Sequence, residues 1–128
     1  MALIINKQHM DENILMGNIT IGKFLGVQFI DDDRQAYHNG YYIYHGEEEE
    51  IIDLPYQAED WMFHIYIEWL YPVYRKCITV ADEMDNEDLY IKLDVIQDAL
   101  LDAEPAEVLF DRIVEFINLY NEIKDGGR

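Results

Sequence analysis

Residues 105–124 carry the clearest structural pattern of the sequence, because their apolar side chains recur at the spacing of an α-helix. At about 100° of rotation per residue, those side chains fall within an arc of about 100°, and acidic ones occupy the opposite arc. Pro105 suits the first turn, where no amide partner is required. The apolar set is Ala106, Leu109, Ile113, Phe116, Ile117 and Tyr120. The pattern predicts an amphipathic helix over 105–124 that packs on a core.

Three further segments also favour helices. Residues 86–102 carry leucines and Ile96 on one face and aspartates on the other, which predicts a helix. Asp85 is available as its N-cap. A short strand over residues 89–93 is the competing prediction. Residues 65–83 predict a helix that is buried around most of its circumference, with Cys77 on its apolar stripe. Pro72 is expected to bend this helix. A helix over 18–25 ends at Gly26.

Residues 27–64 have a different pattern, which indicates strands. Residues 27–30 and 41–45 are short runs of apolar, aromatic and β-branched residues around a turn-rich connection, as in a hairpin. Residues 51–54 and 61–64 predict two more strands. The predicted fold class is therefore α+β, with a small, mostly antiparallel sheet layered with three to four helices and a helical C-terminal half. We expect one domain over residues 12–124, a flexible lead-in over 1–11 and a frayed end over 125–128.

Composition limits the function classes. Half of the 128 residues are hydrophobic, which suffices for a core, and 27 acidic residues against 9 basic ones give a net charge of −18. Such a charge repels phosphate backbones and anionic lipids, so we expect no direct nucleic-acid or membrane binding. The sequence shows neither a long apolar run nor a signal peptide, which predicts a cytoplasmic protein.

The sequence carries no catalytic or metal-binding motif. His38, His45, His64 and Cys77 lack the spacing of a zinc site, and the aspartate-rich stretches 31–33 and 82–88 do not match a calcium-binding loop. The chain contains no serine and no nucleophile motif. We therefore predict no catalytic residue, no metal site, no cofactor and no enzymatic activity.

Two stretches resemble a known family. WMFHIYIEWLYPV (residues 61–73) and VEFINLYNE (residues 114–122) are similar to motifs of small phage and prophage proteins that carry the phage ABA sandwich domain. The matching positions are His64, Trp69, Leu70, Pro72, Val73, Val114, Glu115, Phe116, Ile117, Tyr120 and Asn121. The resemblance implies a layered α/β arrangement and a mobile-element origin, and it implies no activity.

The distribution of acids suggests a partner. Residues 31–60 contain ten acids and one base, and residues 82–115 contain twelve acids and two bases. Two predicted helices carry an acid every fourth residue, about 6 Å apart along the axis. We predict that these acids bind a partner: Asp31, Asp32, Asp33, Glu47, Glu48, Glu49, Glu50, Asp94, Asp98, Asp102, Glu107, Asp111 and Glu115.

Three interpretations of these features remain open. The acids could imitate a nucleic-acid backbone, so that a phage accessory protein binds a basic host protein and inhibits a defence or restriction factor. Alternatively, they could be the ordinary solvent faces of amphipathic helices. As a further alternative, Tyr41, Tyr42 and Tyr44 of the predicted sheet could mediate self-association, for example as a homodimer in a structural or assembly protein.

Overall fold

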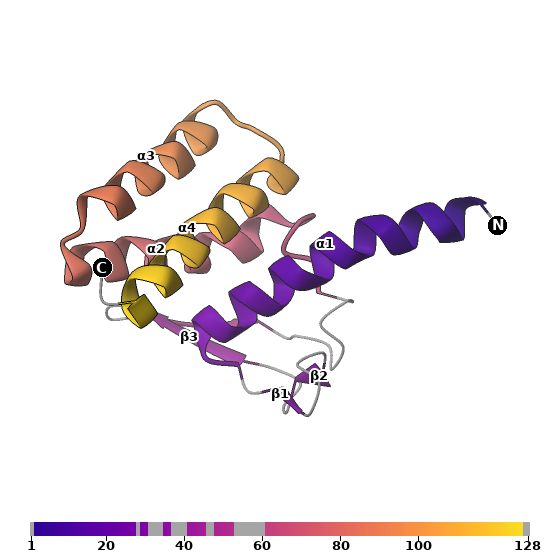
Figure 1. Ribbon diagram of the computed structural model, residues 1–128, viewed down its shortest axis with the longest axis horizontal. Helices are drawn as coiled ribbons and strands as arrows, with labels where there is room; N and C mark the ends of the chain where they lie inside the picture. Colours follow the sequence, from indigo (N-terminus) through magenta and orange to yellow (C-terminus); the bar gives the residue numbers. More distant parts are fainter. Residues whose placement is uncertain are drawn as a thin grey trace.

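Four helices make up the body of the protein. The computed structural model describes the backbone of residues 2–27, 29–30, 35–36, 41–45, 48–52 and 61–126, and the side chains of residues 12–27 and 61–126. The helices are α1 (Ala2–Leu25), α2 (Ile67–Met84), α3 (Glu87–Leu101) and α4 (Ala106–Gly126). Helix α4 is the central one, since each of the other three packs against it (Figure 1).

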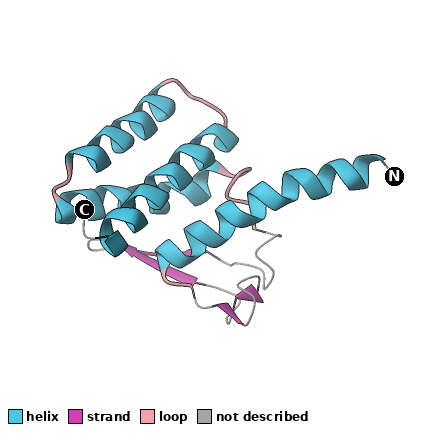
Figure 2. Ribbon diagram, viewed as in Figure 1, coloured by secondary structure: helices cyan, strands magenta, loops and turns pink. Residues whose placement is uncertain are grey.

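The predicted fold class is wrong. Helices account for 83% of the residues with described side chains, and no strand occurs among residues 12–27 and 61–126 (Figure 2). The apolar faces of the helices are buried against one another instead of against a sheet. The layered α/β arrangement that the family resemblance implies is likewise not found in this part of the chain.

Four short strands lie outside that helical part. Strand β1 (Phe29–Ile30) pairs antiparallel with β2 (Gln35–Ala36), and β3 (Tyr41–His45) pairs antiparallel with β4 (Glu48–Ile52). The prediction of a strand over residues 41–45 is correct, but its predicted pairing with residues 27–30 is wrong. Each strand pairs with its nearest neighbour along the chain, which gives two separate two-stranded ribbons. A two-residue connection between β3 and β4 explains this, because short loops favour local hairpins.

The strand predicted over residues 61–64 is a turn. The amides of Ile65 and Tyr66 both donate to the Met62 carbonyl, at 3.0 and 2.9 Å. Trp61 and Phe63 are fully buried, and their rings meet edge to face with centroids 6.1 Å apart. The apolar character of this run thus reflects burial against the helices and not pairing in a sheet.

Helix α1 is longer than predicted. The predicted helix covered residues 18–25, whereas the backbone is helical from Ala2, so residues 2–11 belong to the same helix. The predicted end is correct: α1 stops at Leu25, and Gly26 takes a φ of 91°. Lys76 Nζ of α2 donates to the Phe24 carbonyl at 2.6 Å, which satisfies a carbonyl of the last turn.

The predictions of the other three helices are confirmed, with small shifts at their ends. Helix α4 extends to Gly126, so residues 125 and 126 are helical. Helix α3 excludes the competing strand over residues 89–93. The predicted cap Asp85 is wrong, because Asp85 ends α2 in the left-handed conformation with a φ of 48°. Asn86 caps α3 instead, and its Oδ1 accepts from the amides of Asp88 and Leu89 at 2.9 and 3.2 Å.

Replacing Asn86 by alanine should therefore lower the free energy of unfolding by about 1 kcal/mol, the usual cost of losing an N-cap side chain. Urea denaturation followed by circular dichroism measures the effect. Asp85→Gly is the matched control and should be neutral or slightly stabilising, because glycine adopts a positive φ without strain. A larger loss for Asp85→Gly than for Asn86→Ala would show that the cap is assigned to the wrong residue.

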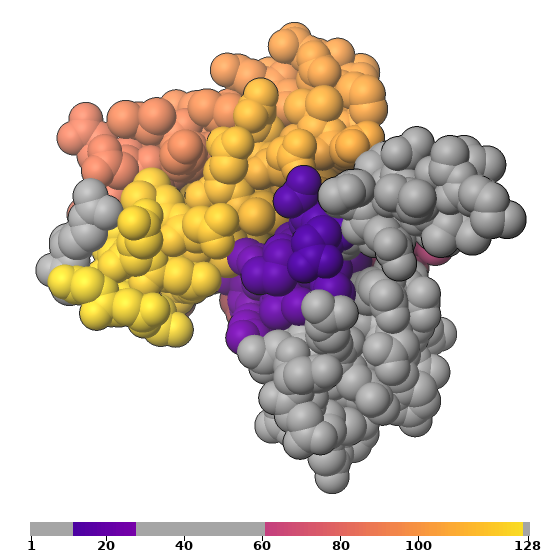
Figure 3. Space-filling view, turned by 45° about the vertical axis from the view of Figure 1, so that its right-hand side comes forward, coloured from indigo at the N-terminus to yellow at the C-terminus, as the bar shows by residue number. Residues whose placement is uncertain are grey.

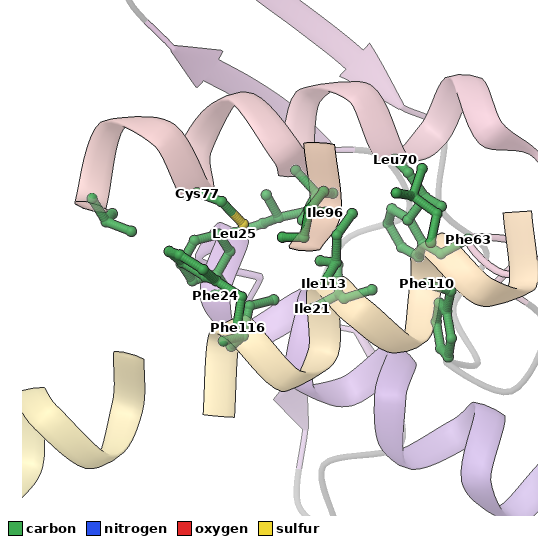
Figure 4. Packing of buried hydrophobic residues seen from close by; sticks show 14 of the residues in the cluster. Ile21, Phe24, Leu25, Phe63, Leu70, Cys77, Ile96, Phe110, Ile113 and Phe116 are labelled. Carbon is green, nitrogen blue, oxygen red and sulfur yellow. The ribbon is translucent and has the colours of Figure 1, made fainter. Parts of the chain in front are cut away.

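All four helices contribute to one hydrophobic core (Figure 4). The prediction that Cys77 lies on the buried stripe of its helix is confirmed, since its side chain is fully buried. Helix α1 packs against α4, and Figure 3 shows the exposed side of its residues with described side chains, in indigo beside the yellow and orange of α4. The core side chains labelled in Figure 4 are Ile21, Phe24, Leu25, Phe63, Leu70, Cys77, Ile96, Phe110, Ile113 and Phe116.

Candidate partner-binding surface

The predicted aspartate ladder of α3 lies on the solvent side of the helix. Asp94, Asp98 and Asp102 are all exposed, while Leu89 and Ile96 on the opposite side are fully buried. The predicted placement of Leu89, Leu93 and Ile96 on one face and of the three aspartates on another is therefore confirmed. Successive aspartates are four residues apart, which corresponds to about 6 Å along the axis. Their carboxylates form a line along the outside of the protein.

No described lysine or arginine forms an ion pair with Asp94, Asp98 or Asp102. Lys92 is the single basic residue between positions 82 and 104. It is directed toward α4, where its Nζ lies 3.8 Å from Glu115 Oε2. Among the described residues, Lys92 therefore pairs with Glu115 of α4 and not with the aspartates of α3.

The acidic ladder of α4 has different surroundings. Glu107, Asp111 and Glu115 are exposed, but Glu107 and Asp111 line a hollow of about 180 Å³ together with Asn13 and Ile14 of α1. Partial burial raises the pKa of the Asp111 carboxyl, and repulsion from Glu107 and Glu115 raises it further, while Arg112 opposes both effects. The ladder therefore faces the α1 side of the protein.

Two bases interrupt the α4 ladder at Glu115. Arg112 Nη1 donates to Glu115 Oε1 at 3.3 Å, and Lys92 reaches the other carboxylate oxygen. Arg112 lines the groove between α1 and α4 and also a hollow between α3 and α4. It therefore lies between the two ladders, and they do not merge into one anionic strip.

The remaining predicted binding residues are in the middle of the chain. Asp31, Asp32, Asp33 and Glu47 lie outside the described residues. The backbone of residues 48–50 belongs to β4, but the side chains of Glu48, Glu49 and Glu50 are not among those described. The candidate surface is therefore built from α3 and α4.

Aliphatic side chains that the charge pattern does not predict also lie on the acidic face of α3. Ile91, Val95 and Leu101 have exposed fractions of 55%, 39% and 83%. At 100° per residue they fall on the same side of the helix as the three aspartates. The rotation angles alone place these three aliphatic positions there, so the sequence carries the signal. The outer face of α3 is thus mixed, with carboxylates and aliphatic groups alternating along it.

A hollow of about 340 Å³ lies between α3 and α4, beside this face. Its aliphatic lining is Val95, Ala99 and Val108. Its charged lining is Asp98, Asp102, Glu104 and Arg112. Three carboxylates against one guanidinium make it net negative, and the guanidinium is already bonded to Glu115. The hollow has the chemistry to accept a cationic side chain with an aliphatic stem.

The residues considered for metal binding or catalysis are not brought together. Burial raises the pKa of the fully buried Cys77 thiol, which keeps it protonated and unreactive. His64 is half-buried in the turn before α2, with its ring 5.9 Å from that of Phe110. Among residues 12–27 and 61–126 no three potential ligands gather in a metal-binding arrangement. The side chains of His38 and His45 are outside the described set.

Comparisons with known proteins add no relative: no family model, curated protein or solved structure matches the chain. The resemblance to phage ABA sandwich proteins thus stays a prediction. Of the helices in the described part, none combines the length and the apolar character that crossing a membrane requires.

Proposed function

We propose that this chain is a non-enzymatic, cytoplasmic protein-binding module that recognises a basic partner protein through the outer face of α3. The observation that supports the proposal is the line of exposed carboxylates at Asp94, Asp98 and Asp102, none of which is paired with a described base. Like charges along one helix face cost some stability. A cationic partner would relieve this repulsion.

The charge of the whole chain favours the same kind of partner. A net charge of −18 produces a negative potential well beyond the surface, which attracts basic proteins and accelerates their association. The same potential repels nucleic acids and anionic lipids. A basic protein surface is therefore the complement that the electrostatics support.

The more specific form of the proposal is that of a nucleic-acid mimic. A phage or prophage accessory protein of this kind would occupy the basic groove of a host protein that handles nucleic acid, such as a defence or restriction factor. The one-turn spacing of the α3 carboxylates supports this form. Lys92 and Arg112 restrict it, because they neutralise Glu115 and leave α3 as the continuous part of the imitation.

Capture from a bacterial lysate tests the proposal. The immobilised full chain should retain basic proteins, and these should elute steeply between about 0.05 and 0.5 M salt, because screening weakens exposed charge pairs. The triple variant Asp94→Asn, Asp98→Asn, Asp102→Asn should lose most of this capture, because it removes the α3 line without adding bulk. Quantitative mass spectrometry of the eluates measures both effects.

The matched control removes three charges elsewhere. Glu12→Gln, Glu68→Gln, Asp125→Asn alters exposed residues of α1, α2 and α4 and should retain the captured proteins. An equal loss in both triple variants would mean that total charge, and not the α3 face, determines capture. In that case the α3 surface would not be a binding site.

A second candidate function rests on an exposed apolar surface at the start of α2. Met62, Ile65, Tyr66 and Tyr71 have exposed fractions of 36%, 52%, 46% and 42%. Such a surface is typical of self-association in a structural or assembly protein. A dimer in sedimentation velocity that persists at high salt, together with salt-insensitive capture, would favour this function over a basic partner.

A further inference from the structure

We infer that the partner presents a basic amphipathic helix, which lies along α3 and places an arginine or lysine side chain in the hollow between α3 and α4. The inference rests on the proposed function, since it specifies the partner of the same surface. It depends on three features: the aliphatic groups among the carboxylates, the lining of the hollow and the charge of the chain.

The exposed aliphatic groups indicate more than charge recognition. Leu101 exposes 83% of its surface and Ile91 55%, next to aspartates that already keep this face polar. A polynucleotide offers little aliphatic surface that could cover these side chains. A protein partner with its own aliphatic residues can cover them, and burial of apolar surface is worth about 25 cal/mol per Å².

The spacing of these groups suits a helix. Val95 follows Ile91 by four residues and Leu101 follows Val95 by six, so the three span about 15 Å along the axis of α3. A second helix packed along α3 presents side chains at i, i+4, i+7 and i+11 over a similar length. Its flanking positions would then lie beside Asp94 on one side and the hollow on the other.

The hollow provides the anchor for a cation. Val95, Ala99 and Val108 can contact the methylene groups of an arginine or lysine, while Asp98, Asp102 and Glu104 can bind its charged end. Arg112 of the chain itself does not provide this cation, because its guanidinium is hydrogen-bonded to Glu115. Buried arginines flanked by apolar contacts are frequent energetic centres of protein interfaces.

The charge of the chain argues against a second copy as the occupant. Two α3 faces brought together would oppose their aspartates, and each chain carries a net charge of −18. Like charges placed opposite each other disfavour association. The complementary occupant is therefore a cationic helix and not another copy of this face.

Two synthetic peptides of identical composition test the inference. The first carries leucines at i, i+4, i+7 and i+11 with arginines on both sides of that stripe, and the second contains the same residues in an order that disperses the stripe. Fluorescence anisotropy with the full chain at about 0.15 M salt measures the affinity. The amphipathic peptide should bind at least about tenfold more tightly than the dispersed one.

Variants of the chain separate the two levels of the proposal. Ile91→Gln, Leu101→Gln should weaken the amphipathic peptide about tenfold and leave the dispersed peptide unchanged; both side chains are exposed, so the fold should be retained, as circular dichroism can verify. The triple variant Asp94→Asn, Asp98→Asn, Asp102→Asn should weaken both peptides. Replacing each peptide arginine in turn by neutral citrulline should reveal one position with a much larger loss, the residue in the hollow.

The contrary outcomes are distinct. Equal affinity of the two peptides, with no response to Ile91→Gln, Leu101→Gln, would overturn the helix-docking inference and leave a basic partner in place. If the aspartate triple variant bound both peptides as tightly as wild type, the proposed function itself would fail. A wild-type dimer that dissociates in Ile91→Gln, Leu101→Gln would make a second copy the occupant and would also overturn the inference.

Discussion

Replacing Phe63 by alanine should lower the free energy of unfolding by about 3–5 kcal/mol, the cost typical of removing a fully buried phenylalanine. The Phe63 side chain has no exposed surface, although it lies in a turn. Its ring meets Trp61 and Trp69 edge to face, with centroids 6.1 and 5.3 Å away. Each aromatic pair adds about 0.5–1.5 kcal/mol beyond burial. The loss is large beside a typical domain stability of about 5–15 kcal/mol.

Urea denaturation monitored by tryptophan fluorescence and by circular dichroism measures this effect. Met62→Ala is the matched control, because Met62 is adjacent and 36% exposed, and it should cost about 1 kcal/mol or less. Similar losses for the two variants would show that residues 61–66 do not pack as a turn with a buried Phe63. Phe63→Leu should give an intermediate loss, because it keeps most of the apolar volume.

The helices of the C-terminal half were predictable because their apolar periodicity coincides with their burial. Ile113, Phe116 and Ile117 are fully buried on one side of α4, as the rotation angles predict. The length of helix α1 was underestimated because its apolar periodicity does not coincide with its burial. At 100° per residue its buried positions spread over an arc of about 220°, which is more than one face, and its apolar residues therefore give no clear helical stripe. The buried positions are Leu15, Gly17, Asn18, Ile19, Ile21, Gly22, Phe24 and Leu25.

The strand prediction over residues 61–64 shows the limit of short patterns. A run of four apolar residues cannot distinguish a strand from any other buried segment, because its period is undetermined over so short a length. The outcome depended on a contact distant in sequence: Asn18 Nδ2 of α1 donates to the Trp61 carbonyl at 3.2 Å. Such a bond holds the turn against α1 and is not encoded by neighbouring residues.

In the candidate site, too, some features follow from the helical period and others depend on tertiary contacts. The exposure of Asp94, Asp98 and Asp102 follows from the period of α3 alone, so the sequence predicted it. The neutralisation of Glu115 by Lys92 depends on how α3 packs against α4, and the partial burial of Asp111 depends on α1. These tertiary contacts separate two ladders that are indistinguishable in the sequence.

Replacing Gly17 by valine should destabilise the protein by about 3 kcal/mol, because the larger side chain would force α1 away from α4. A Cβ atom at Gly17 would overlap the Phe110 ring, with Cε2 at 2.7 Å, and would lie 3.3 Å from Val114 Cγ2. Alanine introduces the same Cβ and should also destabilise, by about 1–3 kcal/mol. This loss should outweigh the gain in helix propensity from glycine to alanine, about 1 kcal/mol. Thermal and urea denaturation measure both variants.

The identity of the clashing partner can be tested by compensation. Phe110→Leu removes part of the ring that a Cβ at Gly17 would meet, so Gly17→Ala should cost less in the Phe110→Leu background than in the wild type. Coupling between residues in contact is typically about 0.5–3 kcal/mol, which a double-mutant cycle resolves. Met16→Ala is the control on α1, because Met16 is 57% exposed and its replacement should change stability by about 0.5 kcal/mol or less. If Gly17→Ala instead stabilised the protein, as its helix propensity alone would predict, the close approach of α1 and α4 would be refuted. The groove beside Phe110 and Asp111 would then have a different shape, since α1 forms one of its walls.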